Sequence, residues 1–430
     1  MRIAHLMPGT CNVFYCENCL RDSGLAEAWR AAGHETFLVP LYLPIRSDGR
    51  AGEGESPLFL GGINIHLQEK FALFRRTPRW FDRLLDRRRL LRWAARRASM
   101  TSASSLGGTL LSMLRGDEGR QAKEVRRLIA YLAERRPEVV LLSDALLAGL
   151  ARPIRERTGA VVVCLLQDEA AFVDALPTRE REEAWALLRR CAADVAAFAA
   201  PSEYYRGVMA ERLAVAPERI ALVRYGLCLD GYAPASVPPR PPVLGFLGAV
   251  EPAKDLAALL EALALLRKRP GLEDLRLRAV GGAAPGGAPL LDAAQRRAAA
   301  EGLAEAVEFL PNLPRPERQA FLRGISVLAV PTRQPAAYGA YILEALASGV
   351  PAVVSRHGGA VELIEATGGG VLVEPGDALA LADALEPLLA DAARARALGA
   401  RGRAAVIDRF DIRRSAQDLA DLCRRAARAT

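Results

Sequence analysis

The sequence predicts an α/β protein built from two doubly wound domains, each a parallel sheet covered by helices. Three observations support this class. The 430 residues exceed one ordinary core and fit two domains of roughly 200 residues each. Short apolar runs alternate with helical patterns, the order that produces βαβ units and parallel sheets. A proline-rich stretch, residues 232–243, separates two such series, because its prolines exclude helix and interior strand.

These two series set the expected boundaries. We expect a first domain over residues 1–235, a second over 236–405, and a C-terminal helix over 406–430 that can pack on either of them, including back on the first. Residues 68–135 interrupt the alternation with an Arg-rich helical region, which we interpret as an insertion. Ligands of open α/β sheets bind beyond the carboxyl ends of the strands, so the default site is a cleft between the domains.

The first domain opens as a strand, a loop, a helix and a second strand. "RIAHLMP" is a short apolar run, "LRDSGLAEAWRAA" has apolar residues at helical spacing, and "ETFLVPLYL" follows Gly33, which ends the helix. "PEVVLLSDALL" and "AVVVCLLQDEAAF" are predicted as buried strands that end in polar residues. "DVAAFAAPSEYYRGVMAERLAVAPERIALVRYG" adds a strand, a helix beginning at Pro201–Ser202 and another strand.

The second domain restarts the same alternation. "LGFLGAV", "DLAALLEALALLRK" and "LRLRAVGG" predict a strand, a helix and a strand. Further along, "SVLAVPT" predicts a strand, "RQPAAYG" the loop after it, and "AYILEALASG" a helix that ends at Gly349. The loops that follow strands are therefore the segments to search for site residues.

Composition indicates a globular protein without a spanning helix. Hydrophobic residues make up 51% and charged residues 25% of the chain, which is typical of folded soluble domains. No stretch reaches 18 uninterrupted apolar residues, and "MRIAHLMPG" is too short and too strand-like for a signal peptide. We therefore expect a cytoplasmic, bacterial-type protein.

Positive charge is concentrated in one segment. The formal net charge is +8, and residues 75–97 hold ten Arg and two Asp, with Trp80, Phe81 and Trp93 among them. The preferred interpretation is a solvated helical face. The alternatives are peripheral contact with the inner membrane or a phosphorylated acceptor. Nucleic acid ranks last, because no recognisable binding module accompanies the charge, and we expect no nucleic-acid partner.

Seven cysteines, an odd number, do not form an evident disulfide framework. Cys11, Cys16 and Cys19 have the C-x4-C-x2-C spacing of plant-type ferredoxins. The next cysteine, Cys164, is too remote to be an obvious fourth ligand. Reduced loop thiols are therefore the preferred interpretation and a metal or cluster the alternative; we expect no metal site.

Two loops of the first domain carry candidate residues. Gly9 follows the first strand, where a glycine allows backbone to approach a ligand and the next helix start attracts anions. Gln167 and Asp168 follow a buried strand, a favoured place for acid–base or substrate-orienting groups. The alternatives are a simple turn at Gly9 and capping of the next helix at 167–169.

Two loops of the second domain carry the others. Lys254 lies at a helix start, from which it can reach a diphosphate or stay solvated. The N–H groups of Gly339, Ala340 and Tyr341 are expected at the next helix start, where they can hold phosphate oxygens. Glu344, one turn further, is placed to accept hydrogen bonds from a vicinal diol such as a ribose.

Three stretches together resemble a known family. "GLAEAWRAAGHE", "FLPNLPRPERQAFL" and "LEALASGVPAVVSRHGGAVELIEATGGGVLVEPGD" are similar to the family 4 glycosyltransferases. These are GT-B-fold enzymes of two Rossmann-like domains, which mostly transfer a sugar from a nucleotide-sugar with retention of anomeric configuration. The similarity covers nearly the whole chain and is strongest over residues 325–376.

The resemblance implies roles for particular residues. It places Glu344 on the ribose and Lys254 on the phosphates, with Gly9 in the first-domain loop that approaches the donor phosphate. The remaining donor-binding candidates belong to the base-contacting "FLPNLP" segment or to the diphosphate-binding turn: Asn312, Leu313, Tyr338, Gly339, Ala340 and Tyr341. The family's first domain is the acceptor side.

The sequence departs from the family pattern at three positions. Ala336 stands eight residues before Glu344 where the family commonly has Glu, Ala249 stands where it has Arg, and Gln167 where it often has His. The loss of one charge-assisted contact to a diphosphate costs on the order of 2 kcal/mol, about thirtyfold in affinity. The nearby residues that can compensate are Arg333, Gln334, Arg356 and His357.

The expected function is that of a retaining glycosyltransferase of the hexosyltransferase type. A UDP-, GDP- or ADP-sugar would be the co-substrate, no cofactor or metal would be required, and the acceptor is unknown, with an anionic or lipid-linked molecule favoured. The resemblance implies that the leaving phosphate serves as the base, with Asp168 and Gln167 as the catalytic-site candidates. The alternative is a catalytically impaired relative that binds a nucleotide or sugar, or serves as a scaffold; Ala249 and Ala336 favour it.

Overall fold

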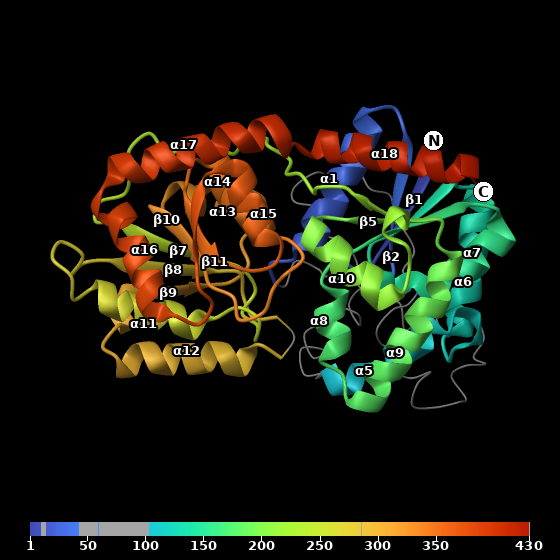
Figure 1. Cartoon of the computed structure of the whole chain (residues 1–430), viewed down its shortest axis with the longest axis horizontal. Helices are drawn as coiled ribbons and strands as arrows, with labels where there is room; N and C mark the ends of the chain where they lie inside the picture. Colours follow the sequence, from blue (N-terminus) through green and yellow to red (C-terminus); the bar gives the residue numbers. More distant parts are fainter. Residues whose placement is uncertain (10–13, 43–58, 60–102, 285, 430) are drawn as a thin grey trace. The chain divides into compact units, whose positions relative to one another are not determined.

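The computed structural model describes residues 1–9, 14–42, 59, 103–284 and 286–429 (Figure 1). They form two compact units. The first comprises Met1–Cys11, Asn18–Arg224 and Ser415–Thr430, and the second Asn12–Glu17 and Tyr225–Arg414. Cys11 and the basic segment 75–97 lie outside the described residues, as does most of the predicted insertion.

The first unit contains a six-stranded, wholly parallel sheet in the order β2-β1-β3-β4-β5-β6. Its central strands are short runs rich in Val, Leu and Ala that are buried on both faces, as in a sheet covered on both sides. The strands are β1 (Arg2–Met7), β2 (Glu35–Pro40), β3 (Val139–Leu142), β4 (Val161–Leu165), β5 (Ala197–Ala200) and β6 (Ile220–Leu222).

The helices of the first unit connect these strands. They are α1 (Glu17–Ala31), α5 (Ala103–Leu114), α6 (Ala122–Arg135), α7 (Ala151–Thr158), α8 (Glu169–Asp174), α9 (Thr178–Cys191), α10 (Glu203–Leu213) and α18 (Ile412–Ala429). The 3₁₀ turns are η2 (Gly116–Glu118), η3 (Ala145–Leu150), η4 (Ala192–Asp194) and η5 (Pro217–Arg219). Within the predicted insertion, the described part is helical, as α5 and α6 show.

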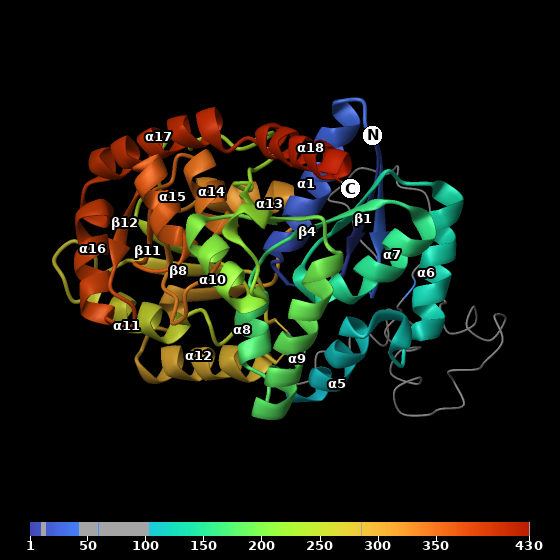
Figure 2. The same cartoon turned by 45° about the vertical axis from the view of Figure 1, so that its right-hand side comes forward.

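The C-terminal helix α18 lies beside α1 in both views (Figures 1 and 2). The indole Nε1 of Trp29, in α1, donates a hydrogen bond of 2.7 Å to the carbonyl of Ala416. Ala416, Leu419 and Cys423 recur at helical spacing and are buried. The chain therefore returns to the first unit after completing the second.

The second unit also contains a parallel six-stranded sheet, in the order β12-β11-β10-β7-β8-β9. Its strands are β7 (Val243–Leu247), β8 (Arg276–Val280), β9 (Val307–Leu310), β10 (Val327–Val330), β11 (Ala352–Ser355) and β12 (Gly370–Val373). The order of connection reverses between β7 and β10, which makes this pair the topological switch point where ligands of such sheets bind. The predicted pair of doubly wound, Rossmann-like domains is thus confirmed.

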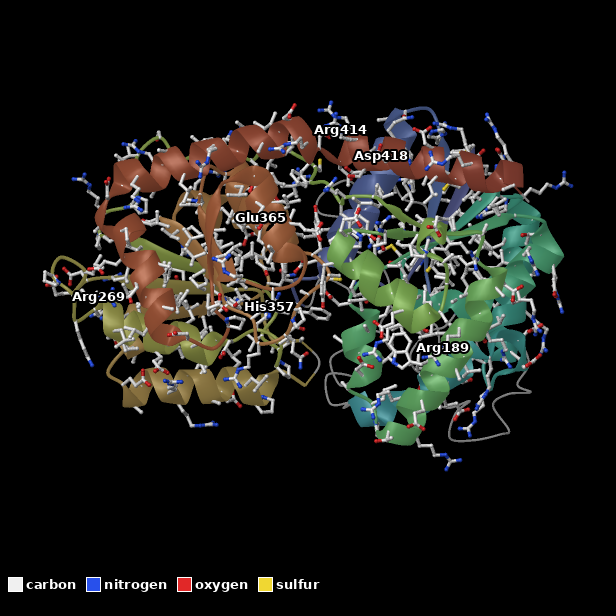
Figure 3. All side chains as sticks on the ribbon, viewed as in Figure 1. Arg189, Arg269, His357, Glu365, Arg414 and Asp418 are labelled. Atoms are coloured by element: carbon white, nitrogen blue, oxygen red, sulfur yellow. The ribbon has the colours of Figure 1, made fainter. Side chains whose placement is uncertain are left out.

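Helices cover both faces of this second sheet, with α11 and α12 on one side and α13 to α15 on the other (Figure 1). The helices are α11 (Leu256–Leu266), α12 (Ala288–Ala300), α13 (Arg315–Arg323), α14 (Ala340–Ala347), α15 (Gly359–Thr367), α16 (Ala378–Ala390) and α17 (Ala392–Arg409), with the 3₁₀ turn η6 (Ala304–Ala306). Arg269, labelled in Figure 3, follows α11 and pairs with Asp383 and Glu386 of α16 at 2.6 Å each.

The proline-rich connector joins β6 to β7 and belongs to the second unit. Pro234 packs against Gly349, where an added Cβ would approach Pro234 side-chain atoms to 3.1 Å. Tyr232 is buried, with 4% of its surface exposed. Among the described residues, no helix combines the length and the apolar character needed to cross a membrane.

The packing of α18 against α1 can be tested by mutation. We expect Leu419→Ala to lower the free energy of unfolding by about 2–5 kcal/mol, because it leaves a cavity at a fully buried position. The control is Asp418→Ala on the exposed face of the same helix (Figure 3), which should change stability by less than about 0.5 kcal/mol. Calorimetric unfolding measures both, and equal effects would contradict this packing.

Candidate active site

The switch point of the second sheet brings together the loops that follow β7 and β10. The two strands pair through Leu244 and Val327, and the backbone of Lys254 pairs with Thr332 just beyond the strand ends. Lys254 directly precedes Asp255, the N-cap of α11, whose Oδ1 accepts from Ala258 N at 3.2 Å. Lys254 is therefore fixed by the fold at the place where the sequence predicted it.

Lys254 points its ammonium group at the beginning of α14. Only 7% of its side chain is exposed, and Nζ lies 4.5 Å from the centre of the Tyr341 ring. A cation above an aromatic face is stabilised by the ring quadrupole. Nζ also lies 4.0 Å from Oε1 of Glu17, which belongs to the second unit through the segment Asn12–Glu17.

Helix α14 begins with a glycine and no side-chain cap. Its N-cap, Gly339, has an extended φ of −175° and gives the first N–H groups no side-chain acceptor. The N–H of Ala340 instead donates to Oε2 of Glu17 at 2.6 Å. The helix start thus holds a carboxylate, where the sequence predicted N–H groups for phosphate oxygens.

Glu344 lies one turn into α14 and is completely buried. Its Oε1 accepts from Arg318 Nε at 2.7 Å and from the hydroxyl of Tyr232, and its Oε2 accepts from the hydroxyl of Tyr15 at 2.6 Å. Arg318 also donates to the carbonyl of Leu313 at 2.9 Å. The sequence predicted Glu344 but none of these three donors, which come from α13, the connector and the segment after β1.

The electrostatic environment of this cluster keeps Tyr15 and Tyr232 protonated, so that both hydroxyls can donate hydrogen bonds. Burial raises the pKa of Tyr15 and Tyr232 well above the ordinary range, and the negative charge of Glu344 raises both further. Burial, the largest single cause, lowers the pKa of Arg318, but the charge of Glu344, the two tyrosines and the hydrogen bond to Glu344 together raise it, so the pKa is raised overall. Both hydroxyls therefore carry their protons, and the guanidinium stays charged.

Other predicted donor residues take separate positions around α14. The hydroxyl of Tyr338 donates to the carbonyl of Tyr225, with the two rings edge to face at 5.7 Å. Asn312 and Leu313 lie in the loop after β9, and Leu313 is joined to Glu344 through Arg318. The predicted base-contacting loop and the predicted ribose carboxylate are therefore parts of one hydrogen-bonded cluster.

Two of the four residues named as compensating are engaged elsewhere. Arg333 Nε pairs with Asp255 Oδ2 at 2.9 Å, and Arg356 Nε pairs with Glu374 at 3.2 Å. Gln334 is exposed. These contacts keep Arg333 on the start of α11 and Arg356 beside the end of β12.

His357 is the fourth of these residues and follows β11 (Figure 3). Its Nε2 lies 2.6 Å from the hydroxyl of Thr332, in the loop after β10. Burial lowers the pKa of His357, while Glu374 raises it, so the ring is neutral near pH 7.

Ala336, which stands where the family commonly has Glu, is held by its backbone. Its carbonyl accepts from Gly359 N at 2.9 Å, and a Cβ added to Gly358 would lie 2.4 Å from that oxygen.

The first unit holds a second buried polar cluster beyond β3 and β4. Gln167 is 5% exposed, and its Nε2 donates to the carbonyl of Ser143. Ser143 Oγ donates to Asp22 at 2.5 Å, and Arg21 pairs with the same Asp22 carboxylate. Among the described residues Gln167 Oε1 has no hydrogen-bond partner.

Asp144, which follows Ser143, is a further candidate that the sequence analysis missed. Burial raises the pKa of Asp144 to about 6, with Asp22 raising it and Arg21 lowering it. Its Oδ1 is buried and, within the part of the chain described, finds no hydrogen-bond donor. The sequence does contain a signal for Asp144, because "SD" directly follows an apolar strand, as "QD" does at Gln167.

Asp168 and Glu169 have opposite environments. Asp168 is exposed and occupies the N-cap position of α8 without a side-chain cap bond. Glu169 is buried and accepts at 2.8 Å from Ala145 N, Gln167 N and the Tyr205 hydroxyl. Burial, and then the charge of Asp144, raise the pKa of Glu169 to about 8. Glu169 therefore ties together the loops after β3 and β4.

Gly9, Cys16 and Cys19 lie in the chain between the end of β1 and the first turn of α1. Gly9 follows β1 with φ of 76°, a left-handed conformation that favours glycine. Cys16 and Cys19 are half-buried thiols, and the described cysteines form no disulfide. Among the described residues no group of three or more His, Cys, Asp or Glu has the arrangement of a metal site.

The architecture defines the class of protein. Sucrose-phosphate synthase from Thermosynechococcus elongatus superposes with a TM-score of 0.73 and 20% identity, each chain covered completely. Anabaena HepE in complex with UDP and glucose gives 0.67 and 16% identity, with 98% of this chain and 99% of that chain covered. The chain therefore has the GT-B fold.

Sequence comparison then gives a family resemblance. Residues 233–405 match the model described as "Glycosyl transferases group 1". D-inositol 3-phosphate glycosyltransferase of Salinispora tropica is 32% identical over 233 residues, 50% of this chain and 48% of that protein. The GDP-mannose-dependent alpha-(1-6)-phosphatidylinositol monomannoside mannosyltransferase of Mycolicibacterium smegmatis is 37% identical over 195 residues, 44% of this chain and 49% of that protein. The chain spans about half the length of these curated relatives. The predicted resemblance to a family 4-type glycosyltransferase is confirmed.

The buried pair Arg318–Glu344 gives the first test of the site. Arg318→Met leaves the Glu344 carboxylate buried without its cation, and should lower the free energy of unfolding by about 3–5 kcal/mol. Adding Glu344→Leu should restore part of that loss, because the uncompensated charge is removed with its partner. A double-mutant cycle by denaturant unfolding measures the coupling, and strictly additive losses would contradict the pairing.

The pKa of Glu169 predicts a pH dependence of stability. Its folded pKa of about 8 lies above the ordinary value of 4.5, so the unfolded chain releases this proton first and stability falls as pH rises between the two values. The slope for one such group is at most about 1.4 kcal/mol per pH unit. Melting temperatures across pH 5–9 should therefore decline in the wild type and decline less in Glu169→Gln. An identical pH profile in the variant would rule out this assignment.

Proposed function

We propose that the chain is a glycosyltransferase that uses a nucleotide-sugar donor bound at the switch point of the second unit. The observation that carries this proposal is the carboxylate of Glu17, held between the N–H of Ala340 and the ammonium of Lys254. A helix N-terminus beside a buried cation is a site for an anion. Diphosphate is the anion that the family-model match of residues 233–405 favours.

The proposed reaction exchanges one C–O bond for another. The bond between the anomeric carbon and the diphosphate oxygen breaks, an acceptor hydroxyl oxygen bonds to that carbon, and its proton passes to an oxygen of the leaving diphosphate. Lys254 and the start of α14 stabilise the charge that develops on the leaving group. The resemblance favours retention of configuration and a UDP-, GDP- or ADP-sugar; the HepE structures that support this choice contain UDP or UDP-glucose.

For the acceptor we propose a polyhydroxy compound recognised in the first unit. Asp144 Oδ1 and Gln167 Oε1 are buried acceptor atoms that lack donors among the described residues, and hydroxyl groups are donors that fit them. The names of the curated relatives include an inositol phosphate and a phosphatidylinositol mannoside, which favours an anionic or lipid-linked polyol. A cytoplasmic enzyme, in peripheral contact with the membrane where the acceptor is lipid-linked, agrees with this chemistry.

Nucleotide binding tests the donor site. Isothermal titration with UDP, GDP and ADP should give a dissociation constant for one of them, and Lys254→Met should weaken it by roughly thirtyfold through loss of about 2 kcal/mol. Lys268→Met, exposed beyond the far end of α11, is the matched control and should bind like the wild type. No binding by the wild type would overturn the proposal. Binding without hydrolysis or transfer of any sugar nucleotide would indicate the impaired alternative.

Kinetics of the matched carboxylates Asp144 and Asp168 test the acceptor site. With the donor identified above and a panel of polyols as acceptors, Asp144→Asn should raise the acceptor KM about tenfold, the cost of one charge-assisted hydrogen bond, while the nucleotide affinity stays constant. Asp168→Asn is the comparison, because Asp168 is exposed. A KM change confined to Asp168→Asn would assign acceptor orientation to Asp168 instead.

A further inference from the structure

The segment 14–17 contacts the loops and helix starts of the second unit. Tyr15 N donates to the carbonyl of Gly281, after β8, at 2.9 Å, and the Tyr15 hydroxyl donates to Glu344. Glu17 accepts from Ala340 N and lies 4.0 Å from Lys254 Nζ. Tyr15 is 4% exposed. These contacts seat the segment on the residues to which the proposed function assigns the donor.

Glu17 presents the chemistry of a phosphate group. Its two oxygens are divided between a helix N-terminal N–H and an ammonium group, the donors that bind phosphate oxygens in proteins. Glu251 also faces this place; burial raises the pKa of Glu251, Lys254 lowers it and Glu17 raises it. The cation of Lys254 is thus partly neutralised by Glu17 in this structure.

Tyr15, two residues earlier, donates its hydroxyl to Glu344 in the way expected of a ribose hydroxyl. Its OH donates to Oε2 of Glu344, the carboxylate expected to receive a ribose hydroxyl. Its ring centre lies 5.7 Å from the guanidinium carbon of Arg318. A single short segment therefore satisfies both a predicted phosphate-binding group and a predicted diol-binding group, at the same time.

We propose that the segment Phe14–Glu17 is an internal ligand of the donor site, with Glu17 in the place of a phosphate and Tyr15 in the place of a ribose hydroxyl. This inference rests on the proposed function. A nucleoside diphosphate must displace the segment before it binds, so its apparent affinity is the intrinsic affinity reduced by the fraction of molecules in which the segment has left. The chain thus carries its own competitive inhibitor.

Weakening the segment should tighten nucleotide binding. Glu17→Gln removes the charge that competes for Lys254, and Tyr15→Phe removes the hydroxyl that competes for Glu344. Each substitution should lower the dissociation constant of the bound nucleotide, UDP, GDP or ADP, by three- to tenfold. Glu27→Gln, exposed on α1 and equal in charge change, is the matched control and should leave the affinity unaltered. Unchanged or weaker binding by both segment variants would overturn the inference.

A second measurement needs no nucleotide. Amide hydrogen exchange at residues 14–17 should be slow in the wild type, because Tyr15 N–H is bonded to Gly281 O, and faster in Glu17→Gln but not in Glu27→Gln. Fast exchange in the wild type would show that the segment is not seated. If the segment is protected yet no nucleotide binds to any variant, the proposed function fails and the docking of the segment stands. If the wild type binds nucleotide and the segment is unprotected, only the internal ligand fails.

Discussion

The buried charge of Glu344 is the constraint on which the second unit depends. A carboxylate with no exposed surface is costly, by several kcal/mol, unless donors surround it. Arg318, Tyr232 and Tyr15 supply those donors from three segments far apart in the sequence. The same four side chains therefore fix α13, the proline-rich connector and the segment after β1 against α14. A connector that composition alone describes as a linker becomes part of the core because its single tyrosine, Tyr232, completes this cluster.

The position of α14 in turn sets the anion site. The N–H of Ala340, at its start, donates to Glu17, and the loop after β7 brings Lys254 to the same carboxylate. Such a site binds anions well only if its donors are fixed before the ligand arrives, and a buried cation is costly to hold without an anion close by. Glu17 relieves that penalty. The contact of Glu17 with Lys254 and Ala340 therefore stabilises the unliganded protein, and under the proposed function the same contact lowers the apparent affinity for a donor.

The sequence predicted the two parallel sheets and the proline-rich boundary between the two series of βαβ units. It also predicted the elements on which Lys254 and Glu344 lie. Each of these depends on local periodicity or on the loop directly after a strand. It did not predict Tyr15, Tyr232 or Arg318. Their relation to Glu344 is a tertiary one, and nothing in the spacing of a lone tyrosine in a loop indicates which carboxylate it will meet. Asp144 could have been found, since it follows a buried strand as Gln167 does.

Two of the departures from the family pattern, Ala336 and Ala249, have opposite effects on the charge near the proposed anion site. The family commonly places Glu where Ala336 stands and Arg where Ala249 stands, so this chain lacks one negative and one positive group, and the formal charge near the site is unchanged by the pair of losses. The long-range attraction for a diphosphate then still depends on Lys254, the start of α14 and the competing Glu17. What is removed is short-range hydrogen bonding, which contributes to affinity where it acts equally in the ground and transition states and to the rate only where it is stronger in the transition state. Under the proposed function, comparing nucleotide affinity with the rate of transfer therefore shows how the cost of the two alanines is divided between binding and catalysis.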